Sequence, residues 1–535
     1  MCACATSRSA LLALVALACA AGCKINVGSI DVHLVYSAKD KDNPLKPADV
    51  TRIRVRVEGQ GFAPREAEFS RGTGGGRAVL SEIPVGRDRR VIVEGLYSTG
   101  AVLSRGVSAP FDMDEGTTHL YLFISKIKES SGPPADTDPG FGARFRVRMR
   151  GSTGEQGRAF HTATLLPDGT VLVAGGAAKL AEGGGLLDPV EATHALRTAE
   201  RFDPTAGAFI KEPALDTCEP DMDLLCLRRK RAFHGALLFG GDGRVMLVGG
   251  EPIGEEPHTE FFDPQTLRFV NGPKLDTDRS RAGVTVVPGA LGGIVAVAGM
   301  DAQGGALESF ELYNPDSGEF EPLAIDDIEE RIGATAVAFQ EGLALIGGWS
   351  GPWPGTPSDQ VDMIRGESGQ FVNTVIHLKE ARAGHTATLI KDGKMADVLV
   401  CGGVNDGGTV SSTCEIVNLD PDSPGSELIP AMELEYERWG HTATLLDDGR
   451  TLLVAGGFRA WPPNPDLPET AWQYFERLDV LDRERLVSRV PLWLKSPRAG
   501  HSATLLKNGM VVLIGGLRKD NGDVPDPDYE IFNPE

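Results

Sequence analysis

The sequence predicts an all-β protein in two parts, and three observations carry this prediction. The chain of 535 residues contains 66 Gly and 35 Pro, a content that favours tight turns and short strands over long helices. Residues 24–128 alternate apolar and polar side chains in short runs, which is the pattern of half-buried strands. Beyond them one motif occurs seven times. Together these features predict a small β-sandwich followed by a seven-bladed β-propeller.

The first 22 residues are typical of an export signal. Their apolar run, residues 10–18, is too short to stay in a bilayer as a spanning helix. The segment Ala20-Ala21-Gly22-Cys23 resembles the lipobox of bacterial lipoproteins, with residues 16–19 as a rival site. The resemblance implies cleavage before Cys23 and acylation of that residue, which would tether the protein to a membrane. The alternative is a simple secretory signal.

The residue after the lipobox bears on the compartment. In the lipoprotein family Asp at this position retains the protein in the inner membrane, and here it is Lys24. The resemblance therefore implies the outer membrane of a bacterial cell envelope, with the protein facing the periplasm or the exterior. The formal net charge of −22 repels nucleic acid, so we expect no nucleic-acid partner.

Four cysteines beyond Cys23 fit an oxidising compartment. Cys401 ends one predicted strand and Cys414 begins the next, so a symmetric hairpin would place them opposite each other. Cys218 and Cys226 share one loop. We expect the disulfides Cys401–Cys414 and Cys218–Cys226, with buried free thiols as the alternative.

Composition sets the domain boundaries. The signal peptide covers residues 1–22 and the β-sandwich covers residues 23–128, where no catalytic cluster stands out and a spacer role is expected. Residues 129–142, rich in Ser, Gly, Pro and Asp, form a linker. The propeller takes residues 143–535.

Each repeat unit opens with an Arg-x-Gly-His type motif, continues through an Asp-Gly or Asn-Gly turn and reaches a Gly-Gly pair. The turn residues tolerate the positive φ of a tight hairpin. In the third and fourth units Val284 and Ala334 replace the histidine, and Met300 replaces the second glycine. The opening arginines are Arg158, Arg231, Arg281, Arg331, Arg382, Arg438 and Arg498. Because they recur in each unit, we expect the arginines and histidines to be structural.

These units resemble the kelch repeat, in the bacterial form also found in the central domain of galactose oxidase. The resemblance implies four-stranded blades arranged around an axis. Galactose oxidase holds copper with two tyrosines and two histidines, one pair adjacent as Tyr-His, and no tyrosine here precedes a histidine. We therefore assign no catalytic residue, no metal ligand and no cofactor.

The chain ends predict how the propeller closes. The last unit stops after its third strand, at Phe532-Asn533-Pro534-Glu535. Residues 143–149 precede the first unit and have strand character. We expect this segment to supply the missing strand and lock the ring, which removes two exposed sheet edges.

The long, variable loops favour one face of the propeller as the functional face. Four tryptophans lie on or beside these loops and are candidate contacts for a sugar ring or a protein partner: Trp349, Trp353, Trp461 and Trp472. The alternative is that they pin their own loops. The acidic loop at 520–528 lacks the spacing of an EF-hand, so a solvated loop is favoured over a Ca²⁺ site.

The sequence thus predicts a membrane-anchored envelope lipoprotein whose propeller binds a protein or glycan ligand without catalysis. One alternative is a carbohydrate-active enzyme, either like galactose oxidase or a sugar mutarotase. The other is a purely structural envelope component.

Overall fold

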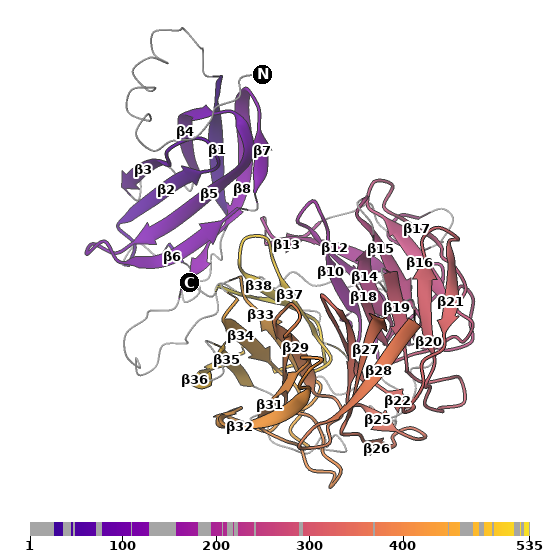
Figure 1. Ribbon diagram of the computed structural model, residues 1–535. Helices are drawn as coiled ribbons and strands as arrows, with labels where there is room; N and C mark the ends of the chain where they lie inside the picture. Colours follow the sequence, from indigo (N-terminus) through magenta and orange to yellow (C-terminus); the bar gives the residue numbers. More distant parts are fainter. Residues whose placement is uncertain are drawn as a thin grey trace. The chain divides into compact units, whose positions relative to one another are not determined.

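The computed structural model describes residues 26–533 with gaps. The gaps are 36–43, 46–48, 71–76, 109, 128–156, 180–193, 206, 211–217, 219–222, 240–241, 288–292, 368–369, 448, 461–473, 481–485, 495–496, 518–524 and 526–528. Contacts divide the chain into a first unit, Met1–Tyr36 with Leu45–Ile124, and a second unit, Ser37–Pro44 with Ser125–Glu535. The regular structure of the described residues is all β (Figure 1). They include no helix of the length and apolarity that a membrane span requires.

The first unit contains two sheets. In the smaller sheet β1 (Val27–Val35) lies between β4 (Arg77–Pro84), which is antiparallel to it, and β8 (Gly116–Phe123), which is parallel. The larger sheet has the order β3 (Arg65–Ser70), β2 (Arg52–Glu58), β5 (Gly86–Leu96) and β6 (Val102–Val107), with β7 (Phe111–Met113) paired to β5.

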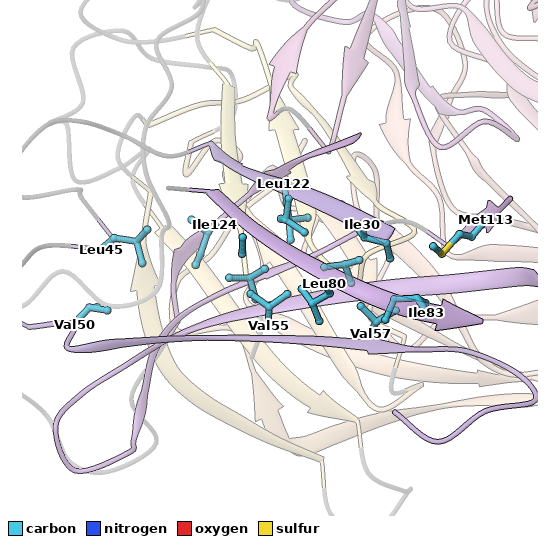
Figure 2. Close-up of a cluster of buried hydrophobic side chains, with 14 of the residues drawn as sticks. Ile30, Leu45, Val50, Val55, Val57, Leu80, Ile83, Met113, Leu122 and Ile124 are labelled. Carbon is cyan, nitrogen blue, oxygen red and sulfur yellow. The ribbon is translucent and has the colours of Figure 1, made fainter. Parts of the chain in front are cut away.

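Apolar side chains from both sheets form one core in the first unit (Figure 2). Ile30 and Val32 of β1 are fully buried, as are Val55 and Val57 of β2. Because side chains alternate between the faces of a strand, residues 31 and 33 of β1 lie on the opposite face from this core. The unit is a two-layer sandwich, and its strands are those that the alternating sequence pattern indicates.

The second unit contains six four-stranded sheets and one three-stranded sheet of the repeating kind among its described residues. Each is an antiparallel meander in sequence order. The first three sheets are β10 (Thr162–Leu165), β11 (Val171–Ala174), β12 (Ala199–Asp203) and β13 (Ala208–Phe209); β14 (Gly235–Phe239), β15 (Arg244–Val248), β16 (Thr259–Asp263) and β17 (Arg268–Asn271); and β18 (Gly283–Val287), β19 (Gly293–Val297), β20 (Phe310–Asn314) and β21 (Glu319–Leu323).

The remaining sheets continue this order. They are β23 (Thr335–Phe339), β24 (Gly342–Ile346), β27 (Gln360–Glu367) and β28 (Gln370–His377); β29 (Thr386–Lys391), β30 (Asp397–Cys401), β31 (Thr413–Asn418) and β32 (Gly425–Glu433); β33 (Thr442–Leu445), β34 (Thr451–Ala455), β35 (Tyr474–Val480) and β36 (Leu486–Trp493); and β37 (Ser502–Leu505), β38 (Val511–Ile514) and β39 (Tyr529–Phe532). A small extra sheet joins β22 (Arg331–Ile332), β25 (Trp349–Ser350) and β26 (Thr356–Pro357). The segment 143–149, predicted to complete the last sheet, lies outside the described residues.

The first strands of successive sheets contact one another, and β10 of the first sheet also contacts β37 of the last (Figure 1). Backbone hydrogen bonds join the same two sheets: Phe160 N–H donates to Gly500 O at 2.8 Å, and Gly516 N–H donates to Arg158 O at 2.9 Å. Contacts that pass from sheet to sheet therefore return from the seventh to the first.

In six of the seven sheets, contacts among the described residues show a buried arginine that ties the second strand to the third. Arg158 donates to the carbonyl oxygens of Gly175 (2.8 Å) and Thr198 (2.9 Å) and forms an ion pair with Glu200. These bonds satisfy carbonyl groups at a point where the ladder ends. The corresponding ion pairs are Arg231–Glu260, Arg279–Glu311, Arg331–Asp362, Arg382–Glu415 and Arg498–Glu530.

The third sheet corrects the predicted alignment of the repeat. Arg279, and not Arg281, donates to the strand-end carbonyl oxygens, those of Ala298 and Ser309. A Cβ added at Gly299 would contact Ser280 O and Ala282, so Ala282 rather than Val284 occupies the histidine position. Gly299 is the second residue of the glycine pair and Met300 follows it. Two arginines two residues apart fit the motif equally well in sequence, and only the hydrogen bonds distinguish them.

The repeat histidines link neighbouring sheets. Nε2 of His234 is hydrogen-bonded to Thr162 Oγ1 in the preceding sheet at 2.9 Å. The same bond joins His441 to Thr386, His501 to Thr442, and His161 of the first sheet to Ser502 of the last. These buried rings therefore have the structural role that their repetition predicts.

Candidate ligand-binding site

One apolar cluster draws side chains from all seven repeating sheets, and we call it the hub. Its members lie either just before the first strand of a sheet or just after the glycine pair. Isolated β-bridges connect these two positions within a sheet, for example Ala159↔Ala177 and Ser280↔Met300. The buried members are Ala159, Met300, Ile332, Trp349, Ala383, Val404, Trp439, Phe458, Ala499 and Leu517. Half-buried Phe160, Phe233, Ile253, Ala306, Trp353 and Val410 pack against them.

Aromatic rings and one guanidinium form a continuous row in the hub. Phe160 and Phe233 are stacked with ring centroids 4.1 Å apart. The Arg281 guanidinium lies 3.9 Å from the Phe233 centroid and 4.5 Å from that of Trp353, so it connects the two rings through cation–π contacts. Trp353 meets Trp349 at 5.1 Å in an edge-on arrangement.

The row continues through buried rings. Trp349 and Trp439 lie 6.3 Å apart, and Trp439 stacks on Phe458 at 4.8 Å. The Trp439 indole N–H donates to Ala460 O at 2.7 Å, which fixes its orientation. These three rings are nearly inaccessible to solvent, so they support the row from inside, whereas Phe160, Phe233 and Trp353 remain partly accessible.

Glycines in the repeat motif leave the room that these rings need. A Cβ at Gly384 would lie 3.0 Å from Trp439 Cε3 and 3.2 Å from Trp349 Cη2. A Cβ at Gly333 would lie 3.2 Å from Trp349 Cζ3. The same motif position is occupied by Phe160, Phe233 and Arg281 in the first three sheets. This position thus holds a large residue in the first three sheets and glycine in the other four.

The electrostatics of the hub centre on Arg281. Its Nε donates to Glu251 Oε1 at 2.8 Å, and Ser280 Oγ lies 3.2 Å from the same oxygen. The Glu251 and Arg281 side chains are 1% and 8% exposed. Nη2 of Arg281 has no hydrogen-bond partner among the described residues.

The four tryptophans predicted to contact a ligand differ in their positions. Trp349 directly follows the glycine pair of its sheet and is only 5% exposed, so its ring packs within the hub instead of facing a ligand. Trp353 is half-buried and lies in the middle of the row, between Arg281 and Trp349. Trp461 and Trp472, like Cys23, lie outside the described residues.

Sequence reasoning missed the other members of the hub. Phe160, Phe233 and Arg281 stand where other units have glycine, and Glu251 interrupts a mostly apolar position. The signal in the sequence is the departure of these residues from the type found at the same motif position in the other units. Loop length alone directed attention to the tryptophans.

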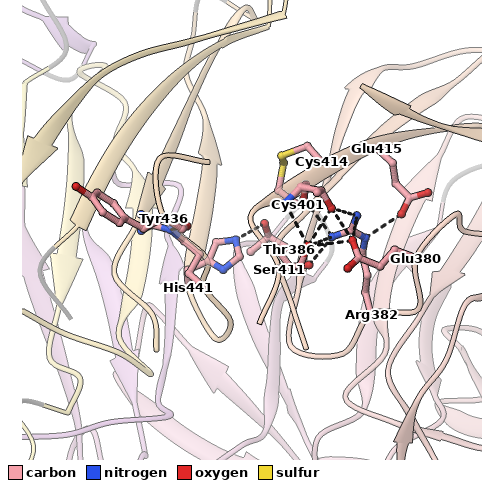
Figure 3. Close-up of a disulfide and its surroundings, with 12 residues drawn as sticks. Glu380, Arg382, Thr386, Cys401, Ser411, Cys414, Glu415, Tyr436 and His441 are labelled. Carbon is pink, nitrogen blue, oxygen red and sulfur yellow. Dashed lines mark hydrogen bonds and ion pairs between the residues drawn. A yellow bond between two sulfur atoms is a disulfide. The ribbon is translucent and has the colours of Figure 1, made fainter. Parts of the chain in front are cut away.

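The disulfides are present as two cross-links in the second unit. Cys401 and Cys414 are directly opposite partners on β30 and β31, with Cα atoms 4.2 Å apart (Figure 3). Cys218 and Cys226 have Cα atoms 5.4 Å apart. Figure 3 also shows Arg382 with Glu380 and Glu415 beside the first disulfide. Both cross-links stabilise the scaffold and contain no reactive thiol.

A groove lies on the surface of the second unit, away from the hub residues. It has a volume of about 440 Å³ and is lined by Ile416, Asn418 and residues 423–429 of β31, β32 and the turn between them. No aromatic ring lines it, and Glu427 is its one ionisable residue. It therefore offers fewer specific contacts than the hub.

Comparisons with known proteins agree with a kelch-like β fold. No protein-family model matches the chain. An F-box/kelch-repeat protein of Arabidopsis thaliana is 28% identical over 207 residues, covering 35% of this chain and 40% of the plant protein. The chain therefore matches less than half the length of that relative. A solved structure, a fungal alcohol oxidase of the AA5 family in complex with copper, has a TM-score of 0.53 and 16% identity, covering 72% of this chain and 75% of the oxidase chain. The second likeness bears on the fold alone.

The described residues of the second unit do not fit a copper site. No three His, Cys, Asp or Glu side chains in this part of the unit come close enough to hold one ion. Four of the repeat histidines bond to hydroxyl groups between sheets. Tyr313 and Tyr529 are buried against phenylalanine rings. These four histidines and two tyrosines are thus engaged in contacts within the scaffold.

Proposed function

We propose that the second unit is a closed, seven-bladed propeller of the kelch type that presents the hub as a binding site. Closure is supported by the hydrogen bonds between the first and last sheets. A closed ring would hold the rings of the hub on a rigid scaffold, and a preorganised site loses little entropy when it binds.

The ligand that fits the hub best is a glycan or a protein side chain with an apolar face. The observation that carries this proposal is the row Phe160–Phe233–Arg281–Trp353, in which three partly accessible rings form one row with a guanidinium that contacts two of them. Aromatic rings provide apolar stacking area, and Arg and Trp are the residues most often found at the centre of binding sites. No bond-making step is assigned to the site.

Binding by the hub is tested with the purified full chain on an immobilised oligosaccharide panel and by photo-crosslinking to envelope proteins. We expect Phe233→Ala and Trp353→Ala each to weaken capture of the bound ligand at least about tenfold, because hot-spot side chains contribute about 2 kcal/mol or more. Leu428→Ala is the control, since Leu428 lines the groove on β32 and is 38% exposed. Loss of capture in the Leu428 variant alone would assign binding to the groove and overturn this proposal.

We propose further that acylated Cys23 anchors the protein to the outer membrane of a bacterial envelope. The support is the lipobox-like segment and the absence of aspartate at position 24. Replacement of Cys23 by alanine should move the protein from the membrane fraction to the soluble fraction. Retention in the membrane fraction would refute lipid anchoring while leaving the binding site untouched.

A carbohydrate-active oxidase is the second candidate, favoured by the likeness in fold to the copper-bound alcohol oxidase. This candidate requires one copper ion per chain and oxidation of a primary alcohol. Copper analysis after loading, with an assay for peroxide release from galactose and simple alcohols, distinguishes it from a binding protein.

A further inference from the structure

A polar cluster on the first unit lies apart from the hub. Asp31 and His33 project from the face of β1 opposite the core, since Ile30 and Val32 between and before them are fully buried. The parallel pairing of β1 with β8 makes His119 the direct partner of Asp31. Two residues from one strand and one residue 88 positions away thereby meet on one sheet face.

The distances within the cluster match those between ligands of a single metal ion. Asp31 Oδ2 lies 3.1 Å from His119 Nδ1 and 3.3 Å from His33 Nε2. All three ligand atoms lie within 4.8 Å of one another. Two donors about 2.1 Å from a tetrahedral ion are about 3.4 Å apart, so two of the three separations already fit.

One of the three side chains is buried and the other two are partly exposed, so an ion from solvent could reach the buried carboxylate. The Asp31 side chain is 1% exposed, and buried carboxylates are usually paired with a cation or with hydrogen-bond donors. The His33 and His119 side chains are 32% and 61% exposed. An ion can therefore reach the cluster from solvent. The exposed His119 ring has room to rotate, which would bring its ligand nitrogen closer to that of His33.

We propose that Asp31, His33 and His119 bind a divalent first-row transition-metal ion, with Zn²⁺ as the representative ion. Imidazole and carboxylate together suit Zn²⁺, Cu²⁺ and Ni²⁺ better than Ca²⁺ or Mg²⁺, which prefer oxygen ligands alone. Three protein ligands leave a coordination position for water or an outside donor. The site requires no covalent step.

Zinc titration of the full chain tests the site. The protein is purified with a histidine-free affinity tag, and binding of Zn²⁺ alone is followed at neutral pH by calorimetry and by competition with a chromogenic chelator. We expect one zinc ion per chain at this site. His33→Ala and His119→Ala should each weaken binding at least about tenfold, because even outer partners of metal ligands change affinity by about 10–100-fold.

The chain supplies a matched control for a single histidine beside a carboxylate. His377 Nδ1 lies 3.2 Å from Asp359 Oδ1 in the second unit, and no third ligand joins this pair among the described residues. His377→Ala should leave the affinity unchanged. Equal zinc binding by the wild type and the double variant His33→Ala/His119→Ala would overturn the proposal, as would loss of binding in the His377 variant.

Thermal unfolding separates loss of the site from loss of the fold. Zinc should raise the Tm of the wild type and of the His377 variant and leave that of His119→Ala unchanged, because a ligand stabilises only the state that binds it. His119 is largely exposed, so its removal leaves the zinc-free Tm close to that of the wild type. An equal zinc-induced rise in Tm in the His119 variant would contradict the assignment.

Discussion

At the scale of single residues, the scaffold depends on charges removed from water. Arg382 is fully buried and its Nε donates to Glu415, also fully buried, at 2.8 Å. Its Nη1 donates to the carbonyl oxygens of Gly402 (2.8 Å) and Thr413 (3.1 Å). Such a pair adds little stability over well-packed apolar residues, but removal of one partner leaves an uncompensated charge.

We expect Arg382→Met to lower the free energy of unfolding by about 3–5 kcal/mol, because Glu415 and two carbonyl groups lose their donor. The measurement is chemical denaturation. Arg244→Met is the control, since the Arg244–Asp242 pair is about half exposed and surface pairs contribute about 0–1 kcal/mol. Equal losses in the two variants would refute the structural role of the buried pair.

The repeat histidines give the fold a dependence on pH. Burial, followed by the charge of nearby Arg158, lowers the pKa of His161 to about 3. Burial and Arg382 do the same to His385, with a pKa of about 3. Burial also holds the pKa values of His234, His441 and His501 well below the usual 6.5. All five rings are therefore neutral in the folded state near neutral pH.

Acid should destabilise the protein as pH falls below 6.5, because the unfolded chain then binds protons that the folded chain excludes. Each such histidine contributes a slope of up to about 1.4 kcal/mol per pH unit between its unfolded and folded pKa values. His501→Gln should reduce the slope of stability against pH by up to that amount, measured between about pH 6 and pH 5, before most carboxylates titrate. The comparison variant is His377→Gln, which removes a ring that is 63% exposed. An equal change of slope in both variants would contradict the role of burial.

At the scale of the element, the glycine pair explains how neighbouring sheets approach. Gly402 has a φ of +66°, and a Cβ there would lie 2.5 Å from Arg438 O and 2.8 Å from His441 Cε1 of the next sheet. A Cβ at Gly403 would lie 3.0 Å from Ala383 O and from His385 Cβ of its own sheet. The pair therefore fits between two repeat motifs, and a larger residue would force the sheets apart.

Gly402→Ala should destabilise the protein by at least about 2 kcal/mol, through the left-handed backbone and the collision with the next sheet. Gly425→Ala on β32 is the matched control: its φ is not positive and no atom lies within 4 Å of the added Cβ. We expect little change in Tm for the control. A comparable loss in both variants would show that the tight approach at Gly402 has no special role.

At the scale of the whole molecule, Tyr529 couples the last sheet to the first. Its ring is 2% exposed and meets Phe202 and Phe209 of the first sheet with centroids 5.0 and 5.6 Å away. Its hydroxyl donates to Gly207 O. This tyrosine lies on β39, more than 300 residues after its partners, so its contacts bear on whether the ring is closed.

We expect Tyr529→Ala to cost about 3–5 kcal/mol, as for other large aromatic side chains removed from a core. If the ring is closed, amide hydrogen exchange will accelerate in β12 and β13 as well as in β39. Exchange confined to the last sheet would contradict closure. Phe320→Ala, which affects a ring buried against Tyr313 of the third sheet, is the control and should leave exchange in β12 unchanged.

Much of the scaffold could be predicted from the sequence because the same motif occurs seven times. The Arg, His and Gly-Gly positions, the turn residues and the Cys401–Cys414 pairing each follow from local spacing and strand register. In the third unit, where the motif is least regular, Arg279 and Arg281 are two residues apart and either could be its opening arginine. Sequence spacing cannot choose between them, and the choice depends on carbonyl groups in distant strands.

The candidate sites were less predictable for the same reason. The row of Phe160, Phe233, Arg281 and Trp353 assembles from four sheets, and its members occupy positions that carry no fixed residue type. The Asp31, His33 and His119 cluster depends on a parallel pairing across 88 residues, which alternation alone does not specify.

By itself the sequence determined the all-β class, the repeating sheets and their internal hydrogen bonds, because turns, strand alternation and glycine pairs act over a few neighbouring residues. Only the tertiary structure decided which side chains from different strands share a surface, and therefore where a ligand or a metal ion finds its contacts. The physical reason is that binding requires convergence of groups in space, and convergence is fixed by long-range strand pairing and close packing rather than by local backbone preference.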